Sequence, residues 1–198
     1  MLIFQYGQKE IEYLKSKDKI LGQAIDKIGL IKREINPDPF VALIPSIISQ
    51  QISKKAAATV WNRLSQTLGH VTPENIIKTD LAEIQGCGMS LRKARYIKGI
   101  AEAAFSGQVE FDKLQFLEDE DIIKKLILLP GVGTWTAEML LIFSLCRPDV
   151  VSYKDLAIRR GMMNLYQLEE LSPQDFQRYR KNYSPYGSVA SLYLWALS

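Results

Sequence analysis

Apolar residues along the chain recur at intervals of three and four, the spacing that places them on one face of an α-helix. The clearest stretch begins after Ser53, places Val60, Leu64 and Leu68 on one stripe, and stops at Gly69. Ser53 is a favoured N-cap residue, and glycine commonly follows the last turn of a helix. No segment shows the alternation of apolar and polar residues that predicts a half-buried strand. The pattern therefore predicts an all-α protein.

Residues that begin helices precede the other apolar runs. Asp38-Pro39, Thr72-Pro73 and Ser172-Pro173 each combine an N-cap residue with proline at the first helical position. Asp80 and Glu83 have the spacing of a capping box. We expect helices starting near residues 39, 54, 73, 81 and 91, and helices over about 119–128, 134–145, 155–166, 173–182 and 187–197. The segment 21–39 is the predicted boundary: it contains Gly22, Gly29 and Asn36-Pro37-Asp38-Pro39, and the last four residues are expected to break any helix.

Composition excludes several classes of protein. The 198 residues are 47% hydrophobic and 24% charged, which is ordinary for a globular protein. No apolar run approaches the ~18 residues of a membrane span, and the first residues lack the pattern of a signal peptide. We therefore expect no membrane partner and a cytoplasmic location, associated with the nucleoid if the source is prokaryotic.

Few residues are available for metal or nucleophilic chemistry. Cys87 and Cys146 are the only cysteines and His70 is the only histidine. Two isolated thiols do not form a disulfide framework, a zinc site or an iron–sulfur cluster. A single histidine excludes a histidine-based metal site and makes a Ser-His-Asp mechanism improbable.

The net charge of +3 says little about partners, but basic residues occur in pairs at or near predicted helix starts, among them Lys54-Lys55 and Arg92-Lys93. Each pair has two interpretations: a solvated helix face, or a contact with a polyanion.

The most informative segment is Leu128-Leu129-Pro130-Gly131-Val132-Gly133-Thr134-Trp135-Thr136-Ala137. It predicts a helix, a tight glycine turn and a second helix. Gly131 and Gly133 allow positive φ and a close approach of a ligand to the backbone. The N–H groups at the start of the second helix would form an anion site suited to a DNA phosphate. The same turn also occurs in ordinary helix connections.

Three further segments accompany this hairpin. Asp155 follows the apolar pair Val150-Val151, and we expect it within reach of the hairpin helix; it could also be a plain helix N-cap. Gln50 and Gln51 lie at a helix end between apolar stretches, where they could simply face solvent. The fourth segment is Gly88-Met89-Ser90-Leu91-Arg92-Lys93-Ala94-Arg95-Tyr96-Ile97.

In this order the four segments resemble the helix-hairpin-helix DNA glycosylase superfamily, and within it the 3-methyladenine DNA glycosylase II branch. The resemblance covers roughly residues 39–166 and extends more weakly to 185–195. It implies an all-α, two-lobed fold with a cleft between the lobes. The central lobe would comprise residues 39–150 with the hairpin at about 119–145, and both termini, 1–38 and 151–198, would form the second lobe.

The resemblance also implies a monofunctional DNA glycosylase that flips alkylated bases such as 3-methyladenine out of duplex DNA. Asp155 matches the essential aspartate, whose carboxylate would stabilise an oxocarbenium-like transition state. Gln50 and Gln51 match the wedge that fills the gap in the DNA. Trp135 stands where bifunctional members have a lysine nucleophile, and tryptophan cannot form a Schiff base.

The remaining implied residues fall into three groups. The base pocket would be lined by Trp135, Phe40, Tyr153 and Trp195, and the alternative for each of these rings is packing in the core. Backbone phosphates would be bound by Gly131, Val132, Gly133, Thr134, Lys54, Arg92 and Lys93, with a monovalent cation near Gly131 and Gly133. The resemblance implies no cofactor and no iron–sulfur cluster, and a monomer acting on damaged double-stranded DNA.

Two other functions stay open. One is a glycosylase for deaminated or oxidised purines. The other is a helix-hairpin-helix DNA-binding protein without catalysis. Asp155 separates the second from an enzyme, because a carboxylate that faces a phosphate-rich ligand weakens DNA binding and serves no purpose in a pure binder.

Overall fold

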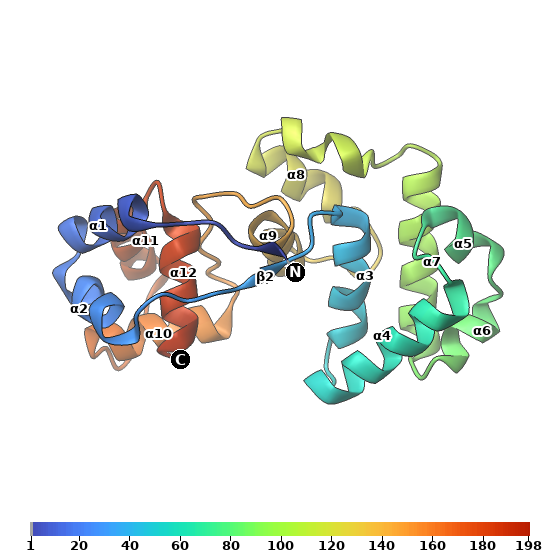
Figure 1. Ribbon diagram of the computed structural model, residues 1–198, viewed down its shortest axis with the longest axis horizontal. Coiled ribbons are helices and arrows are strands. Elements are labelled where there is room, and N and C mark those ends of the chain that lie inside the picture. Colours follow the sequence, from blue (N-terminus) through green and yellow to red (C-terminus); the bar gives the residue numbers. More distant parts are fainter. Residues whose placement is uncertain (1) are drawn as a thin grey trace. The chain divides into compact units, whose positions relative to one another are not determined.

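The computed structural model describes residues 2–198, which form helices joined by short connections and one short antiparallel pair of strands (Figure 1). The prediction of an all-α protein is confirmed. The chain divides into two compact units: unit 2 is Asn36–Leu140, and unit 1 combines the segment that ends at Ile35 with Leu141–Ser198. The sequence analysis placed the two boundaries at 38/39 and 150/151, so the second lies ten residues after the observed division at Leu140/Leu141.

Unit 2 consists of helices, several of which pack against α7. Its elements are α3 (Pro39–Ser49), α4 (Lys54–Leu68), α5 (Pro73–Lys78), α6 (Leu81–Gly86), α7 (Leu91–Phe105), the 3-10 helix η1 (Phe111–Phe116), α8 (Asp119–Leu126) and most of α9 (Thr134–Phe143). α7 packs against α3, α5 and α6, and its buried face carries Ile97 and Ile100.

Some of the N-caps expected in unit 2 are present, and one is not. The side chains of Ser53, Thr72 and Ser90 accept N–H bonds at the starts of α4, α5 and α7, as predicted. The capping box at Asp80 is wrong, because the Asp80 side chain accepts no cap bond. The short helix α6 is held instead by its backbone, in which Ile84 N–H donates to the Asp80 carbonyl at 3.1 Å, and by burial of Ile84.

Unit 1 is built from both ends of the chain. Its elements are β1 (Leu2–Ile3), α1 (Gln8–Lys17), α2 (Lys19–Ile28), β2 (Glu34–Ile35), α10 (Leu156–Tyr166), α11 (Pro173–Tyr183) and α12 (Gly187–Ala196). Leu2 pairs with Ile35 in the antiparallel sheet. Two-residue strands are too short to show an alternating pattern, so they could not be predicted.

Within the predicted boundary segment 21–39, helix α2 continues through Gly22, and the observed division between the units follows Ile35. A Cβ at Gly22 would lie 3.2 Å from the Cα of Lys15, so the missing side chain lets α1 and α2 pack closely. Helix α2 then ends at Gly29, whose φ of +76° is a left-handed conformation that favours glycine.

Helices α10 and α12 pack at even closer range. A Cβ at Gly161 in α10 would overlap the carbonyl of Leu194 in α12, so only glycine fits this crossing. Nearby, the Tyr166 hydroxyl donates to the buried carboxylate of Asp18 at 2.6 Å and lies 2.7 Å from the Tyr183 hydroxyl. Burial raises the pKa of both tyrosines, which therefore remain protonated and join α2, α10 and α11.

Candidate functional site

The turn between α8 and α9 has the geometry of a helical hairpin. The N–H of Val132 donates to the Leu129 carbonyl at 3.2 Å. Gly131 has φ +79°, and a Cβ there would overlap the ring of Tyr96 from α7, so this position requires glycine for two reasons. The contact with Tyr96 thus fixes the turn against α7 at Gly131.

Gly133 differs from the expectation that both glycines take positive φ. It lies outside the left-handed region, and a Cβ built on it would meet no atom within 4 Å. The reason is that the chain reverses at Gly131, and Gly133 already begins the next helix: its carbonyl accepts the N–H of Ala137 at 3.0 Å. Gly133 and Thr134 are exposed, so bare backbone faces outward at the N-terminus of α9, where an anion can approach the N–H groups.

The two glutamines after α3 have different environments. The Gln50 side-chain amide donates to the Gly131 carbonyl at 2.9 Å and is half-buried. Gln51 is exposed and has φ +60°, an uncommon conformation for a residue with a side chain. Gln50 is therefore held by the hairpin, and Gln51 is the one left at the surface.

Lys93 contacts protein atoms, although the sequence analysis expected it to reach a phosphate. Its Nζ donates to the carbonyls of Ile48 at 2.8 Å and Gln50 at 2.6 Å. Burial, reinforced by the neighbouring Arg92, lowers the pKa of this ammonium group. The two carbonyls lie at the C-terminal end of α3, where helix carbonyls lack intrahelical partners and attract a cation.

The other basic candidates remain at the surface. Lys54 is in the first turn of α4 and Arg92 is in the first turn of α7, and both are exposed. A pocket at the start of α7 is lined by Gln50, Gln51, Ile52, Gly88, Met89, Ser90, Arg92 and Lys93. Both predicted wedge residues therefore line the same pocket as Arg92 and Lys93.

Two aromatic candidates of unit 2 differ in exposure. Trp135, the second residue of α9, is 40% exposed, which is unusual for a tryptophan and leaves ring surface for stacking. Phe40 is 5% exposed and packs edge-to-face on Phe111 with ring centroids 5.5 Å apart. Phe40, expected in the base pocket, is thus a core residue of unit 2 in this structure.

Asp155 is a buried carboxylate at the start of α10 in unit 1. Its side chain is the N-cap, and Oδ1 accepts the N–H of Ile158 at 2.9 Å. The residue is 7% exposed. Asp155 is therefore an N-cap, as one of the two interpretations expected. Capping alone does not require burial, because an N-cap residue can lie at the surface. The cap bond also fixes the direction of the carboxylate.

The segment that leads to Asp155 is held by α12. Ser188 Oγ accepts the N–H of Val150 at 3.0 Å and donates to the carbonyl of Arg147, while Ser191 Oγ donates to the Val150 carbonyl at 2.9 Å. Both serines are completely buried. A rigid helix thus positions the extended backbone from which Asp155 follows.

Two more aromatic candidates lie in unit 1, and both are half-buried. Tyr153 packs on Phe176 at 5.0 Å between ring centroids and lies under the guanidinium of Arg159 at 5.2 Å. Trp195 packs on Phe143 at 5.4 Å. Each ring keeps some accessible surface, and a role for either in a base pocket remains a prediction.

The monovalent cation expected near Gly131 and Gly133 remains a prediction. The Gly131 carbonyl accepts the Gln50 amide, which leaves its oxygen a second lone pair. Across residues 2–198 there is no group of three or more His, Cys, Asp and Glu side chains placed to hold a metal ion. Over the same residues no helix combines the length and apolar character needed to span a membrane.

Comparison with known proteins identifies the family. Residues 44–185 match the description HhH-GPD superfamily base excision DNA repair protein. The chain belongs to this superfamily. It is 37% identical over 185 residues to DNA-3-methyladenine glycosylase 1 of Schizosaccharomyces pombe, covering 91% of this chain and 79% of the relative. It is 31% identical to the putative DNA-3-methyladenine glycosylase YfjP of Bacillus subtilis, of which it spans only 56%.

Solved structures of this superfamily share the fold. The crystal structure of a DNA-3-methyladenine glycosidase from Bacillus halodurans superposes with a TM-score of 0.88 at 35% identity, covering 99% of this chain and 92% of the other. The 3-methyladenine DNA glycosylase Mag1 of Schizosaccharomyces pombe, in complex with abasic DNA, gives 0.83 at 32% identity and 95% coverage of both chains. The matched segment 44–185 includes the hairpin, both glutamines and Asp155, and excludes Phe40 and Trp195.

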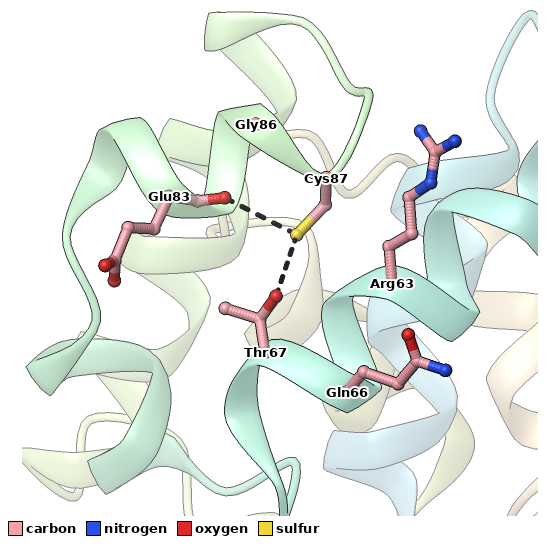
Figure 2. Close-up of a pocket in the computed structure, with 6 residues that line it drawn as sticks. All are labelled: Arg63, Gln66, Thr67, Glu83, Gly86 and Cys87. Carbon is pink, nitrogen blue, oxygen red and sulfur yellow. Dashed lines mark hydrogen bonds between the residues drawn. The ribbon is translucent and has the colours of Figure 1, made fainter.

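A second pocket of this HhH-GPD chain contains contacts that hold two helices together. Cys87 donates to the Glu83 carbonyl at 3.4 Å and lies 3.6 Å from the Thr67 hydroxyl, which joins α6 to α4 (Figure 2). The pocket is lined by Arg63, Gln66, Thr67, Glu83, Gly86 and Cys87. It contains none of the residues predicted for the site.

Sequence reasoning missed the residues that support the HhH-GPD site. Tyr96 and Gly99 of α7 contact the turn, and Ser188 and Ser191 of α12 hold the segment before Asp155. Tyr96 and Gly99 follow Lys93 at intervals of three, so they share its helix face, and this spacing was the available signal. The serines gave none, because their partners lie about forty residues away in sequence.

Proposed function

We propose that this protein is a DNA glycosylase that extrudes alkylated bases, such as 3-methyladenine, from duplex DNA and hydrolyses their N-glycosidic bonds. The observation that carries the proposal is the buried, oriented carboxylate of Asp155 within the segment that matches the HhH-GPD superfamily. The named relatives are 3-methyladenine glycosylases, and one of their structures contains abasic DNA, the product of base removal.

The chemistry follows from the charge that develops during cleavage. The bond between C1′ and the base nitrogen breaks, the base takes the electron pair, and positive charge appears on the sugar. The Asp155 carboxylate stabilises this charge and orients a water molecule, whose oxygen bonds to C1′ while its proton passes to that carboxylate. An alkylated base is cationic before cleavage and leaves as a neutral molecule, so little acid catalysis is required.

We propose further that the enzyme is monofunctional, needs no cofactor and acts as a monomer. Trp135 stands where the resemblance places the lysine of lyase members, and its exposed ring suits stacking on a cationic base. Without that amine the nucleophile is water, and no Schiff base forms. Light scattering of the purified chain, free and with one equivalent of duplex, measures its molar mass and so tests whether it is a monomer.

Between the two glutamines, Gln51 is proposed as the wedge. The Gln50 amide is engaged with the Gly131 carbonyl, whereas Gln51 is exposed. A wedge must leave the protein surface and enter the base stack, and only Gln51 can do so without breaking a hydrogen bond seen here.

The test is identification of the bases released from DNA treated with a methylating agent. Chromatography should show free alkylated purines with wild-type protein and none with Asp155→Asn. Release of bases only from DNA that contains deaminated or oxidised purines, and none from methylated DNA, would indicate another glycosylase specificity. Tight binding of the duplex without release of any base would leave a DNA-binding protein without catalysis.

A further inference from the structure

One face of α7 supports two separate parts of the candidate DNA surface. Lys93 holds the end of α3, from which the loop Gln50–Ser53 begins. One turn later Tyr96 packs against Gly131, and Gly99 leaves room for Pro130, whose Cγ would lie 2.8 Å from a Cβ at that position. Positions 93, 96 and 99 follow one another at helical spacing, so a single rigid helix carries both the wedge loop and the hairpin turn.

A side chain also joins the two parts directly. Gln50 accepts Lys93 Nζ through its backbone carbonyl at 2.6 Å and donates to the Gly131 carbonyl through its side-chain amide at 2.9 Å. Lys93, Gln50 and Gly131 thus form a continuous chain of hydrogen bonds from α7 through the wedge loop to the hairpin. Gln51, the next residue, is held at φ +60°.

We propose that Lys93 and Gln50 are positioning residues that couple phosphate binding at the hairpin to insertion of Gln51 into the DNA stack. The inference rests on the proposed glycosylase function and on Gln51 as the wedge. Lys93 does not bind a phosphate in this role, because its ammonium is committed to two carbonyls. A phosphate that binds the hairpin backbone contacts the same turn whose Gly131 carbonyl accepts the Gln50 amide. The same hydrogen-bonded residues therefore position both the bound DNA and Gln51.

Burial supports this assignment. The Lys93 ammonium is partly desolvated, which lowers its pKa, and two carbonyls replace the lost water. A phosphate-binding lysine is expected to remain hydrated and mobile until DNA arrives. The exposed neighbour Arg92 fits that description better.

The chain offers a matched control. Lys98, also on α7, donates through Nζ to the Ile77 carbonyl at 2.8 Å, at the end of α5 and away from the wedge loop. Lys98→Met therefore removes the same kind of lysine–carbonyl bond from the same helix without touching the chain of bonds from Lys93 to Gly131. Any general loss of stability should appear in both variants.

The experiment compares Lys93→Met, Gln50→Met and Lys98→Met with wild type. Single-turnover base release from methylated DNA is measured with saturating protein. Wedge insertion is followed by the fluorescence of 2-aminopurine placed opposite an abasic-site analogue. We expect Lys93→Met and Gln50→Met to lose on the order of ten-fold or more in base release and most of the fluorescence change. Lys98→Met should match wild type in both.

Two further readouts separate positioning from other roles. The salt dependence of duplex affinity should be unchanged in Lys93→Met; a slope shallower by about 0.9 would mark a lost phosphate contact and overturn the proposal. In a Gln51→Ala background, Lys93→Met should cause no additional loss of base release, because the wedge it positions is gone. A full additional loss would mean a general structural role and would likewise overturn it.

The outcome also distinguishes this inference from the proposed function. If wild type releases bases and Lys93→Met does so equally well, the function stands and the coupling is wrong. If wild type releases no base, the glycosylase function fails, and the fluorescence signal alone decides: a change lost in Lys93→Met supports the coupling, and no change in wild type overturns it.

Discussion

Replacement of Asp155 by asparagine tests the chemistry most directly, because the structure shows what the substitution preserves. Asp155 caps α10 by accepting the Ile158 N–H at 2.9 Å. Asparagine has an oxygen at the same place and is about as good an N-cap as aspartate, so the cap bond can be kept. The free energy of unfolding should therefore change by less than about 1 kcal/mol. What disappears is the negative charge.

The expected kinetic loss is much larger than the loss of stability. Removing one preorganised group that stabilises charge in a transition state costs about 3–4 kcal/mol, or about 10²–10³ in rate. Single-turnover release of alkylated purines should fall by that factor, while the affinity for a damaged duplex stays within a few-fold or improves slightly. The burial of Asp155 places the lost charge in a site of low dielectric, which favours the upper end of the range.

A second aspartate provides the control. Asp38 caps α3 through the Val41 N–H at 3.0 Å and is exposed. Asp38→Asn makes the same chemical change at the same kind of helix position and should leave base release unaltered. If Asp155→Asn retains more than about a tenth of wild-type release, or if Asp38→Asn loses as much, the assigned role of Asp155 is wrong.

Three other predictions follow from the structure. Gly133→Val should leave the melting temperature nearly unchanged, since the new side chain meets open space, but should weaken binding of damaged and undamaged duplexes by similar factors; wild-type affinity would mean that the hairpin is only a connection. Borohydride should trap no covalent protein–DNA adduct during turnover, because Trp135 replaces the lysine, and a trapped adduct would identify an overlooked amine. Gly161→Ala should destabilise the fold by more than about 2 kcal/mol in urea unfolding, because its methyl group would overlap the Leu194 carbonyl; a near-neutral effect would show that α10 and α12 separate easily.

Local chemistry was readable from the sequence. The starts of α4, α5 and α7 depend on whether Ser53, Thr72 and Ser90 can accept an N–H two or three residues ahead, and nothing distant is required. The hairpin was visible for the same reason, since a glycine at the reversal is a local need. Asp155 could be proposed as the catalytic residue because a family motif keeps its order along the chain.

Tertiary structure decided the rest, because burial and partners come from residues far apart in sequence. The sequence does not show why residue 22 is glycine, and the structure does: Lys15 packs against it too closely for a side chain. By its chemistry Phe40 suits either a ligand pocket or the core, and its burial against Phe111 places it in the core. In the sequence Lys93 resembles the many lysines that lie at the surface. The structure places two carbonyls at the end of α3, more than forty residues earlier, within hydrogen-bonding distance of its ammonium group. A charge in a sequence has no fixed role; its role is set by which groups the fold brings within hydrogen-bonding distance and whether water is excluded there.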